Sequence, residues 1–167
     1  MFFFDEGRFG LRSTVMRIWS KRGIPVKVKV KQGFKSFYVY TSISPFNGNN
    51  FSLILPGIGA DMMNIYIEEL SKELKGKNVL IIMDQAGWHK CKELNIPDNI
   101  KIIFLPPYSP ELNPVERFWK EIKKDVVHNK VFETIEDLMD VVSEKIKVMT
   151  DDRIQRLCTC SYLQTYK

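Results

Sequence analysis

A run of five apolar residues, Val79 to Met83, ends in an aspartate, Asp84. A run of this kind is typical of a strand that is buried on both faces of a sheet. Open α/β sheets bind their ligands beyond the carboxyl ends of their strands, so such a strand would carry Asp84 to a place where chemistry occurs. On spacing alone, however, an aspartate in this position is as often the first residue of an ordinary turn.

A proline-rich segment, LPPYSPELNPVERFW, occupies residues 105–119 and predicts a stiff loop followed by a helix. Asn113 is suited to cap the helix and Pro114 to begin it, which puts Glu116 in the first turn. Asn113 and Glu116 also have the spacing of a capping box, in which Glu116 would bond back to the N–H of Asn113. Glu116 lies at the edge of the apolar stripe of the helix, so the pattern allows a cap or a cleft ligand equally.

The other patterns predict one domain that mixes strands and helices. Met1 to Asp5 is expected to form the first strand. Residues 36–43 and 51–55 are expected to form a hairpin, because the turn between them contains Asn47-Gly48. The later elements are a helix at 61–75 ended by Gly76, strands at 79–83 and 100–105, and helices at 113–129 and 134–149, the last capped by Thr134.

Basic residues are concentrated near the beginning of the chain. Nine of the 25 Lys and Arg residues lie between Gly7 and Lys35, a segment with no acidic residue, although the net charge of the chain is only +5. Basic residues interleaved with aromatic ones favour contact with a phosphate backbone, while the alternation from Val26 to Lys31 is also typical of an edge strand. The residues expected to contact DNA are Arg8, Arg12, Arg17, Lys21, Arg22, Lys27, Lys29 and Lys31.

Length and composition limit the class of protein. The 167 residues are enough for one domain with a sizeable core. No apolar run is long enough to span a membrane, and the phenylalanines at the N-terminus are cut off by Asp5 too early to form a signal-peptide core. Cys91, Cys158 and Cys160 fit no zinc spacing and are expected to be reduced thiols. We therefore expect a cytoplasmic protein that does not contact a membrane.

Three strings in the sequence resemble the catalytic motifs of the mariner-type DDE transposases, a group that includes many bacterial insertion-sequence transposases. They are FFFDEGRFGL near the N-terminus, MDQAGWHK around Asp84, and the proline-rich segment described above. The resemblance implies an α/β, RNase H-like (retroviral-integrase-like) fold, with a mixed five-stranded sheet flanked by helices and the first strand beside the fourth. It implies a catalytic domain at residues 1–150 and a tail at 151–167, without the helix-turn-helix domain that precedes this strand in relatives.

The same resemblance implies a metal-dependent active site. It assigns Asp5, Asp84 and Glu116 both as catalytic residues and as metal ligands. Three converging carboxylates repel one another unless a cation is present, and hard oxygen ligands select Mg²⁺ or Mn²⁺. Two ions are expected, because a pair can bind the attacking and leaving oxygens of a phosphoryl displacement.

The residues next to the motif carboxylates receive weaker assignments. Trp88 and His89 are expected to contact DNA, although Trp88 is equally suited to cover the core. Glu6 and Glu111 are not expected to be ligands. Gln85 stands where many relatives have Asn, which leaves the hydrogen bonds around it open.

The function implied by the resemblance is metal-dependent DNA cleavage and strand transfer by a transposase catalytic domain. Its expected partners are transposon ends and target DNA, bound by a homodimer that is associated with the bacterial nucleoid when it acts. Two alternatives remain open: an RNase H-like nuclease without strand transfer, and a non-catalytic DNA-binding remnant or regulator of a transposase.

Overall fold

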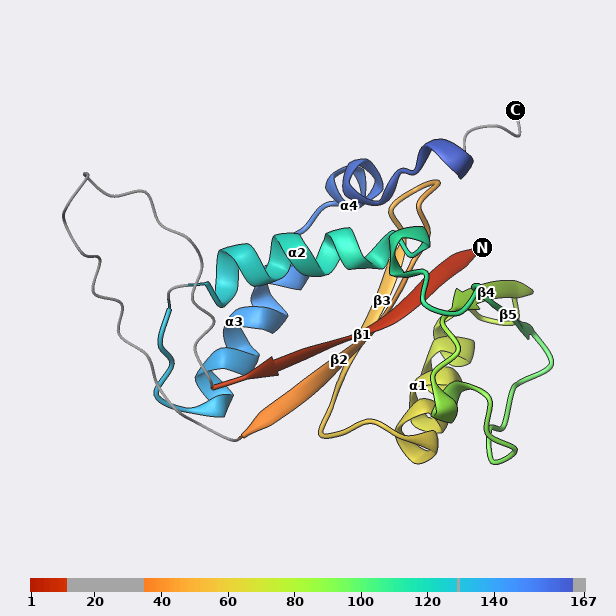
Figure 1. Ribbon diagram of the computed structural model, residues 1–167, viewed down its shortest axis with the longest axis horizontal. Helices are drawn as coiled ribbons and strands as arrows, with labels where there is room; N and C mark the ends of the chain where they lie inside the picture. Colours follow the sequence, from red (N-terminus) through yellow and green to blue (C-terminus); the bar gives the residue numbers. More distant parts are fainter. Residues whose placement is uncertain (12–34, 129, 164–167) are drawn as a thin grey trace.

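The computed structural model describes residues 1–11, 35–128 and 130–163. In this part of the chain a mixed sheet has the strand order β3-β2-β1-β4-β5 (Figure 1). Its pairs are antiparallel from β3 to β1 and parallel from β1 to β5, which confirms the predicted RNase H-like arrangement. The strands are β1 (Phe2–Gly10), β2 (Ser36–Ile43), β3 (Asn50–Leu55), β4 (Val79–Met83) and β5 (Ile100–Phe104).

Strand β1 is longer than the sequence predicted. It continues to Gly10 because it pairs with β2 residue by residue, from Phe3 opposite Ile43 to Gly10 opposite Ser36. The prediction that the first strand stops at Asp5 was therefore wrong, and Asp5 lies in the middle of a strand. Its backbone is fixed by the sheet rather than by a turn.

The first and fourth strands are neighbours, as predicted. Among the described residues β1 pairs with β4 only at its beginning, where Phe2 lies opposite Ile81 and Phe3 opposite Ile82. The same register carried two residues further brings Asp5 level with Asp84, which directly follows β4. The two aspartates therefore lie where the two strands part.

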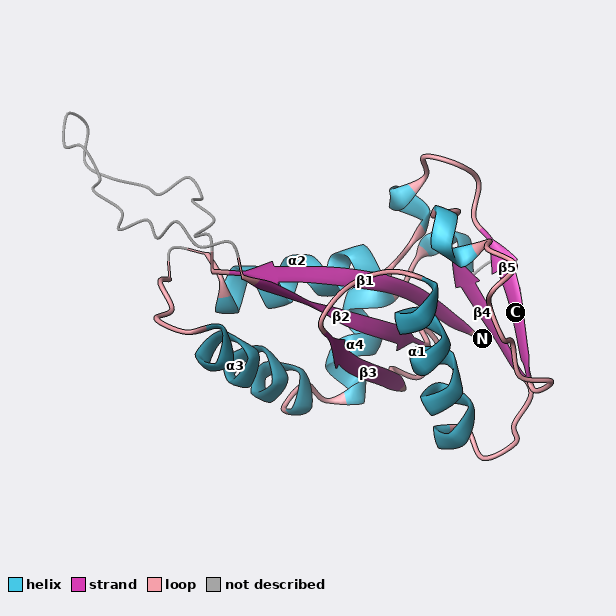
Figure 2. Ribbon diagram, turned by 90° about the horizontal axis from the view of Figure 1, so that it is seen from below, coloured by secondary structure: helices cyan, strands magenta, loops and turns pink. Residues whose placement is uncertain are grey.

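Helices cover both faces of the sheet (Figure 2). On one face α1 (Ala60–Glu73) packs Met63, Tyr66 and Leu70 against side chains such as Phe4 and Tyr40. On the other face lie α2 (Val115–Val126), α3 (Ile135–Lys147) and α4 (Asp151–Cys158). Neighbouring residues of β1 and β2 enter different cores because successive side chains of a strand point to opposite faces.

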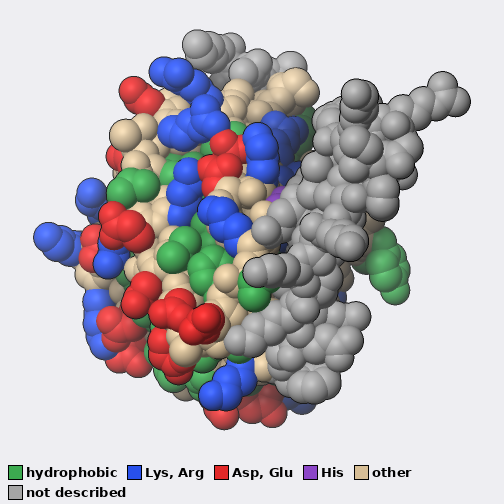
Figure 3. Space-filling view, turned by 90° about the vertical axis from the view of Figure 1, so that its left-hand side faces the viewer, with side chains coloured by type: hydrophobic (Ala, Val, Ile, Leu, Met, Phe, Trp, Pro, Cys, Tyr) green, Lys and Arg blue, Asp and Glu red, His purple; other side chains and the backbone are tan. Residues whose placement is uncertain are grey.

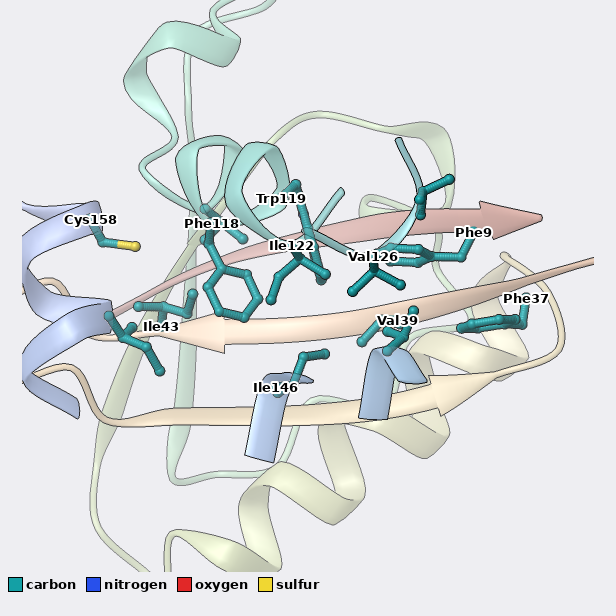
Figure 4. Close-up of a cluster of buried hydrophobic side chains, with 14 of the residues drawn as sticks. Phe9, Phe37, Val39, Ile43, Phe118, Trp119, Ile122, Val126, Ile146 and Cys158 are labelled. Carbon is teal, nitrogen blue, oxygen red and sulfur yellow. The ribbon is translucent and has the colours of Figure 1, made fainter. Parts of the chain in front are cut away.

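Helix α2 is the central element of the second core. Its apolar residues Phe118, Trp119 and Ile122 point toward β1 and β2, where Phe9 and Val39 lie (Figure 4). All five side chains are almost completely buried. The apolar stripe predicted from the sequence thus holds the first turn of α2, and Glu116 with it, against the sheet.

The helix ends show which sequence signals were correct. Helix α1 ends at Glu73, and Gly76 follows in the left-handed conformation at φ 77°, close to the predicted end. Thr134 caps α3 as predicted, and Asp137 completes a capping box with it. Helix α4 was not predicted, although its Ile154 and Cys158 enter the same core as α2. None of the helices in the described ranges is long and apolar enough to cross a membrane.

Candidate active site

Asp5, Asp84 and Glu116 line one pocket of about 410 Å³. Asp5 comes from the middle of β1, Asp84 follows β4, and Glu116 stands in the first turn of α2. The structure therefore brings the three predicted acids to one place, although they are widely separated in sequence. The rest of the lining consists of Gln85, Ala86, Lys90, residues 105–110 and Asn113.

Asp5 is largely buried and is held by an indole. The Nε1 of Trp119 donates a hydrogen bond to its Oδ2 at 3.1 Å. Burial, the negative charge of Glu116 and that of Glu6 together raise the pKa of Asp5 to about 8. Without a cation, this carboxyl group therefore keeps its proton up to about neutral pH.

Gly7 allows Trp119 to reach Asp5. A Cβ atom added at Gly7 would lie 2.9 Å from both Cδ2 and Cε3 of the indole, closer than two carbon atoms can approach. The ring can pack over β1 only because this residue has no side chain. Gly7 is therefore part of the reason that Asp5 has a fixed partner.

Asp84 is held differently, because it lies beyond the end of its strand. Its side chain is 58% exposed, and its Oδ1 accepts hydrogen bonds from the N–H of Ala86 at 3.1 Å and from Nδ1 of His89 at 2.7 Å. The bond from His89 is the main cause that lowers the pKa of Asp84 below its ordinary value. Asp84 is therefore ionised at neutral pH.

His89 lies between two carboxylates and inside the protein. Its side chain is 1% exposed, and its Nε2 is 2.9 Å from Oε1 of Glu6. Burial opposes a charge on the ring, but the hydrogen bonds with Asp84 and Glu6 outweigh it and raise the pKa of His89 to about 9. Trp88, which is half-buried, donates its Nε1 to the same Oε1 of Glu6 at 3.0 Å.

Trp88 and His89, which were predicted to contact DNA, form hydrogen bonds within the protein in this structure. In this structure Nε1 of Trp88 and Nε2 of His89 are directed to Glu6, Nδ1 of His89 is directed to Asp84, and neither residue lines the pocket. Sequence reasoning gave no role to Glu6. More than 80 residues separate it from either partner, so no local pattern could have indicated the contact.

The side-chain amide of Asn113 fixes one wall of the pocket. Nδ2 of Asn113 donates to the backbone carbonyl of Phe4 at 2.8 Å, which ties the beginning of α2 to β1. The Oδ1 of Asn113 accepts from the N–H of Val115, the first residue of α2, at 3.2 Å. The N–H of Asn113 donates to the carbonyl of Pro110 at 3.0 Å and not to Glu116, as a capping box would require. Of the two interpretations of Glu116, the structure therefore favours the pocket over the capping box.

The hydrogen bonds of Gln85, which the sequence left open, are defined in the structure. Its Nε2 donates to the carbonyl of Leu105 at 2.7 Å, and its Oε1 accepts from Nζ of Lys90. The amide thus links the end of β4 to the loop after β5. In that loop Tyr108 stands fully exposed at the pocket with a φ of 56°, a conformation that non-glycine residues rarely adopt.

The donor set suits a hard divalent cation. Carboxylate oxygens are the ligands that Mg²⁺ and Mn²⁺ prefer. Burial, and after it the charges of Glu116 and Glu6, raise the pKa of Asp5, so a cation would favour its ionised form. The residue types therefore fit a metal. As the side chains stand within residues 1–11, 35–128 and 130–163, no three Asp, Glu, His or Cys residues form a group close enough to hold one.

Most of the predicted DNA-contacting residues cannot be placed. Arg8 is exposed on β1. Arg12, Arg17, Lys21, Arg22, Lys27, Lys29 and Lys31 lie outside the described residues. On the face of the molecule seen in Figure 3, basic and acidic side chains are interspersed on the described surface.

Comparison with known proteins identifies the family. Residues 1–139 match the model of the DDE superfamily endonucleases. The chain belongs to this family. An uncharacterized protein of Sinorhizobium fredii, y4pE/y4sA, is 36% identical over 103 residues, which are 61% of this chain and 76% of that protein.

Solved structures of the Mos1 transposase share the fold of this DDE endonuclease domain. The Mos1 paired-end complex with the left transposon end matches 94% of this chain at a TM-score of 0.73 and 14% identity. The Mos1 strand transfer complex matches 94% at a TM-score of 0.72 and 15% identity, and the mariner Mos1 paired-end complex with Mn matches 94% at 0.73 and 14%. The chain spans about half the length of these Mos1 chains: 50%, 50% and 51%. The predicted membership of the DDE enzymes is thereby confirmed by the family match, and the likeness to Mos1 shows that the fold is shared.

Proposed function

We propose that this chain is the catalytic domain of a transposase, which cuts DNA and joins the cut end to a target with the help of divalent metal ions. The observation that carries the proposal is the meeting of Asp5, Asp84 and Glu116 in one pocket, from three different elements. Family membership supports the same chemistry. The Mos1 paired-end complexes with Mn and with Mg support the choice of metal.

The three carboxylates would hold Mg²⁺ or Mn²⁺, with two ions expected. When bound, the ions supply activation of the attacking oxygen and stabilisation of the charge on the phosphate. The indole of Trp119 fixes Asp5, and the imidazole of His89 fixes Asp84. Lys90 adds a positive charge to the pocket lining, where it suits a phosphate oxygen of the DNA backbone.

The reaction has two displacements at phosphorus. In cleavage the oxygen of water bonds to phosphorus and the bond from phosphorus to the 3′ oxygen breaks, which leaves a 3′ hydroxyl and a 5′ phosphate. In joining, that 3′ hydroxyl oxygen bonds to a phosphorus of the target, whose own 3′ oxygen leaves. No covalent bond to the protein is needed in either step.

DNA contact is proposed for Arg8 and for the basic residues between Arg12 and Lys31. Clustered positive charge binds the DNA backbone without regard to sequence. Because transposition brings two ends together, we also propose that the protein acts as a homodimer on DNA.

The test measures cutting and joining separately. Nicking of supercoiled plasmid is followed with Mg²⁺, with Mn²⁺ and with a chelator, and joining is followed as the transfer of a labelled duplex end with a free 3′ hydroxyl into the plasmid. We expect both activities to require the metal and to be lost in Asp5→Asn, Asp84→Asn and Glu116→Gln. The matched control is Glu111→Gln, since Glu111 is an exposed carboxylate near Glu116 that does not line the pocket.

The outcomes separate the alternatives. Nicking without joining would support the RNase H-like nuclease. DNA binding without metal-dependent turnover, unchanged in Asp84→Asn, would support the non-catalytic remnant. If Glu111→Gln lost activity and Glu116→Gln kept it, the assignment of Glu116 would be wrong.

A further inference from the structure

Glu6 is a carboxylate beside the active site that the chemistry proposed above does not use. It follows Asp5 on β1, so the two side chains point to opposite faces of the sheet. Asp5 points to the face of Trp119, while Glu6 contacts His89 and Trp88. Glu6 does not line the pocket, and its side chain is 9% exposed. It is therefore placed to act through other residues rather than on a ligand.

A continuous chain of hydrogen bonds leads from Glu6 to Asp84. Oε1 of Glu6 lies 2.9 Å from Nε2 of His89, and Nδ1 on the other side of the ring lies 2.7 Å from Oδ1 of Asp84. Trp88 donates to the same oxygen of Glu6 at 3.0 Å. Each nitrogen of the imidazole thus has a carboxylate partner, which fixes the tilt of the ring at both ends.

Backbone and aromatic contacts hold the same ring from other sides. His89 ends a short 3₁₀ turn, Gly87–His89, in which its N–H donates to the carbonyl of Ala86 at 2.9 Å. The ring of Phe4 meets the imidazole edge to face, with the ring centres 5.5 Å apart. His89 is thus buried against the core formed by β1 and α1, whereas the carboxylate that it holds is more than half exposed.

We propose that Glu6 and His89 are positioning residues, which hold the Asp84 carboxylate in the orientation needed to bind a metal ion. Asp84 lies beyond the end of β4, where no strand pairing fixes its side chain, so its orientation has to come from hydrogen bonds. Among the described residues its two side-chain hydrogen bonds both end on Oδ1, which leaves Oδ2 for a ligand in the pocket. The inference rests on the proposed metal-dependent function.

Groups that orient a metal ligand affect metal affinity without touching the metal. Removing such a partner typically weakens metal binding by about tenfold or more. The experiment measures the affinity of the metal-free protein for Mn²⁺ by electron paramagnetic resonance. We expect Glu6→Ala to weaken binding by about tenfold. Glu6→Gln keeps an oxygen that accepts from both ring systems and should restore the affinity to within about threefold of wild type.

A matched control separates positioning from general loss of stability. Tyr66 lies in the same core, where its hydroxyl donates to the carbonyl of Phe51 at 3.3 Å. Tyr66→Phe removes one internal hydrogen bond without touching the chain from Glu6 to Asp84, so its Mn²⁺ affinity should equal that of wild type. A folded Glu6→Ala protein with wild-type affinity would overturn the proposal.

A second variant keeps the proposal testable if Glu6→Ala does not fold. Trp88→Phe removes one of the two donors to Glu6 and keeps an aromatic ring. We expect it to weaken Mn²⁺ binding by about threefold, the equivalent of one weak hydrogen bond. Unchanged affinity in Trp88→Phe would then overturn the proposal.

A metal-free measurement separates the failure of this inference from the failure of the proposed function. If wild type binds no Mn²⁺, the proposed metal chemistry fails, and nitrogen NMR of the His89 ring decides whether the chain of hydrogen bonds exists, with His128→Gln used to assign the signals. We expect a slowly exchanging N–H at Nδ1 that shifts in Asp84→Asn. The absence of that protected N–H would overturn the positioning role, whatever the metal data show.

Discussion

Asp5 and Asp84 line the same pocket under opposite conditions. Asp5 lies in the middle of a strand, is largely buried and faces other carboxylates, whereas Asp84 follows a strand, is more than half exposed and faces an imidazole. Burial and like charge raise the pKa of Asp5 to about 8, while the contact with His89 lowers the pKa of Asp84. Two residues of one type thus differ because of what surrounds them.

The two aspartates have opposite effects on the stability of the metal-free protein. A charge on Asp5 is disfavoured in the folded protein, so the metal-free fold is weakened whenever Asp5 is ionised. A charge on Asp84 is favoured, so the same fold gains from it. Only Asp5 therefore has a large destabilisation for a cation to relieve.

The largest expected effect is a stabilisation on removing the Asp5 charge. Asp5→Asn should raise the free energy of unfolding of the metal-free protein at pH 8 by several kcal/mol, because it removes a buried charge close to Glu116 and Glu6. Asp84→Asn should lower it, because His89 loses its charged partner. Urea denaturation of both variants in the presence of a chelator measures the difference. Equal effects of one sign would remove the contrast between the two aspartates.

The second prediction concerns pH. The folded-state pKa of Asp5 is raised from 3.8 to about 8, so its contribution to stability is fully present below the lower value and is lost as the pH rises through the upper one. Its share of the unfolding free energy should fall between pH 4 and 8 by up to about 1.4 kcal/mol per pH unit. The measurement is the difference between wild type and Asp5→Asn across this range. A difference that does not change with pH would contradict the raised pKa.

The third prediction concerns Trp119, the partner of Asp5, and leaves the partners of Asp84 unchanged. Gly7→Ala puts a methyl group against the indole of Trp119 and should destabilise the protein by about 1–3 kcal/mol, as overpacking does. The matched control is Gly57→Ala, since an added Cβ there meets nothing within 4 Å. Thermal unfolding of both variants measures the effect. A Gly7→Ala protein as stable as the control would show that the indole can move freely.

The smallest expected effect comes from removing a single donor. Trp119→Phe keeps an aromatic ring against Phe9 but loses the hydrogen bond from Nε1 to Asp5. The smaller ring adds a cavity cost that does not depend on pH, and the lost hydrogen bond itself should cost about 1 kcal/mol. At pH 5 the loss should be smaller than at pH 9, because hydrogen bonds to a charged acceptor are the stronger ones. Urea denaturation at the two pH values checks the order.

The elements that have a strong local sequence pattern were predicted from the sequence. The hairpin of β2 and β3 was predicted from its strands and its turn, and β4 and β5 from their apolar runs. The extension of β1 to Gly10 and the helix α4 were missed. The length of β1 is set by pairing with β2, and α4 is stabilised by packing of Ile154 and Cys158 on distant elements, so neither has a strong local signal.

The residues of the candidate site also fall into those that the sequence indicated and those that it did not. Asp84 was indicated by the strand before it, and Asp5 and Glu116 were assigned through resemblance to a family. The partners of these acids were not found, because Trp119 lies 114 residues from Asp5 and His89 lies 83 residues from Glu6. A hydrogen bond between side chains so far apart in sequence exists only after the fold has formed. The residues next to Trp119 and His89 in the sequence therefore give no sign of these partners.

The short pairing of β1 with β4 has a mechanical consequence. Within the described residues the backbone ladder between these strands stops at Phe3 and Ile82, just before the two aspartates. Beyond that point the contact of Glu6 with His89 and Trp88 joins the two halves of the sheet. It is a further link between β1 and the segment after β4, made by side chains, so the separation of Asp5 from Asp84 depends on this contact as well as on the strands.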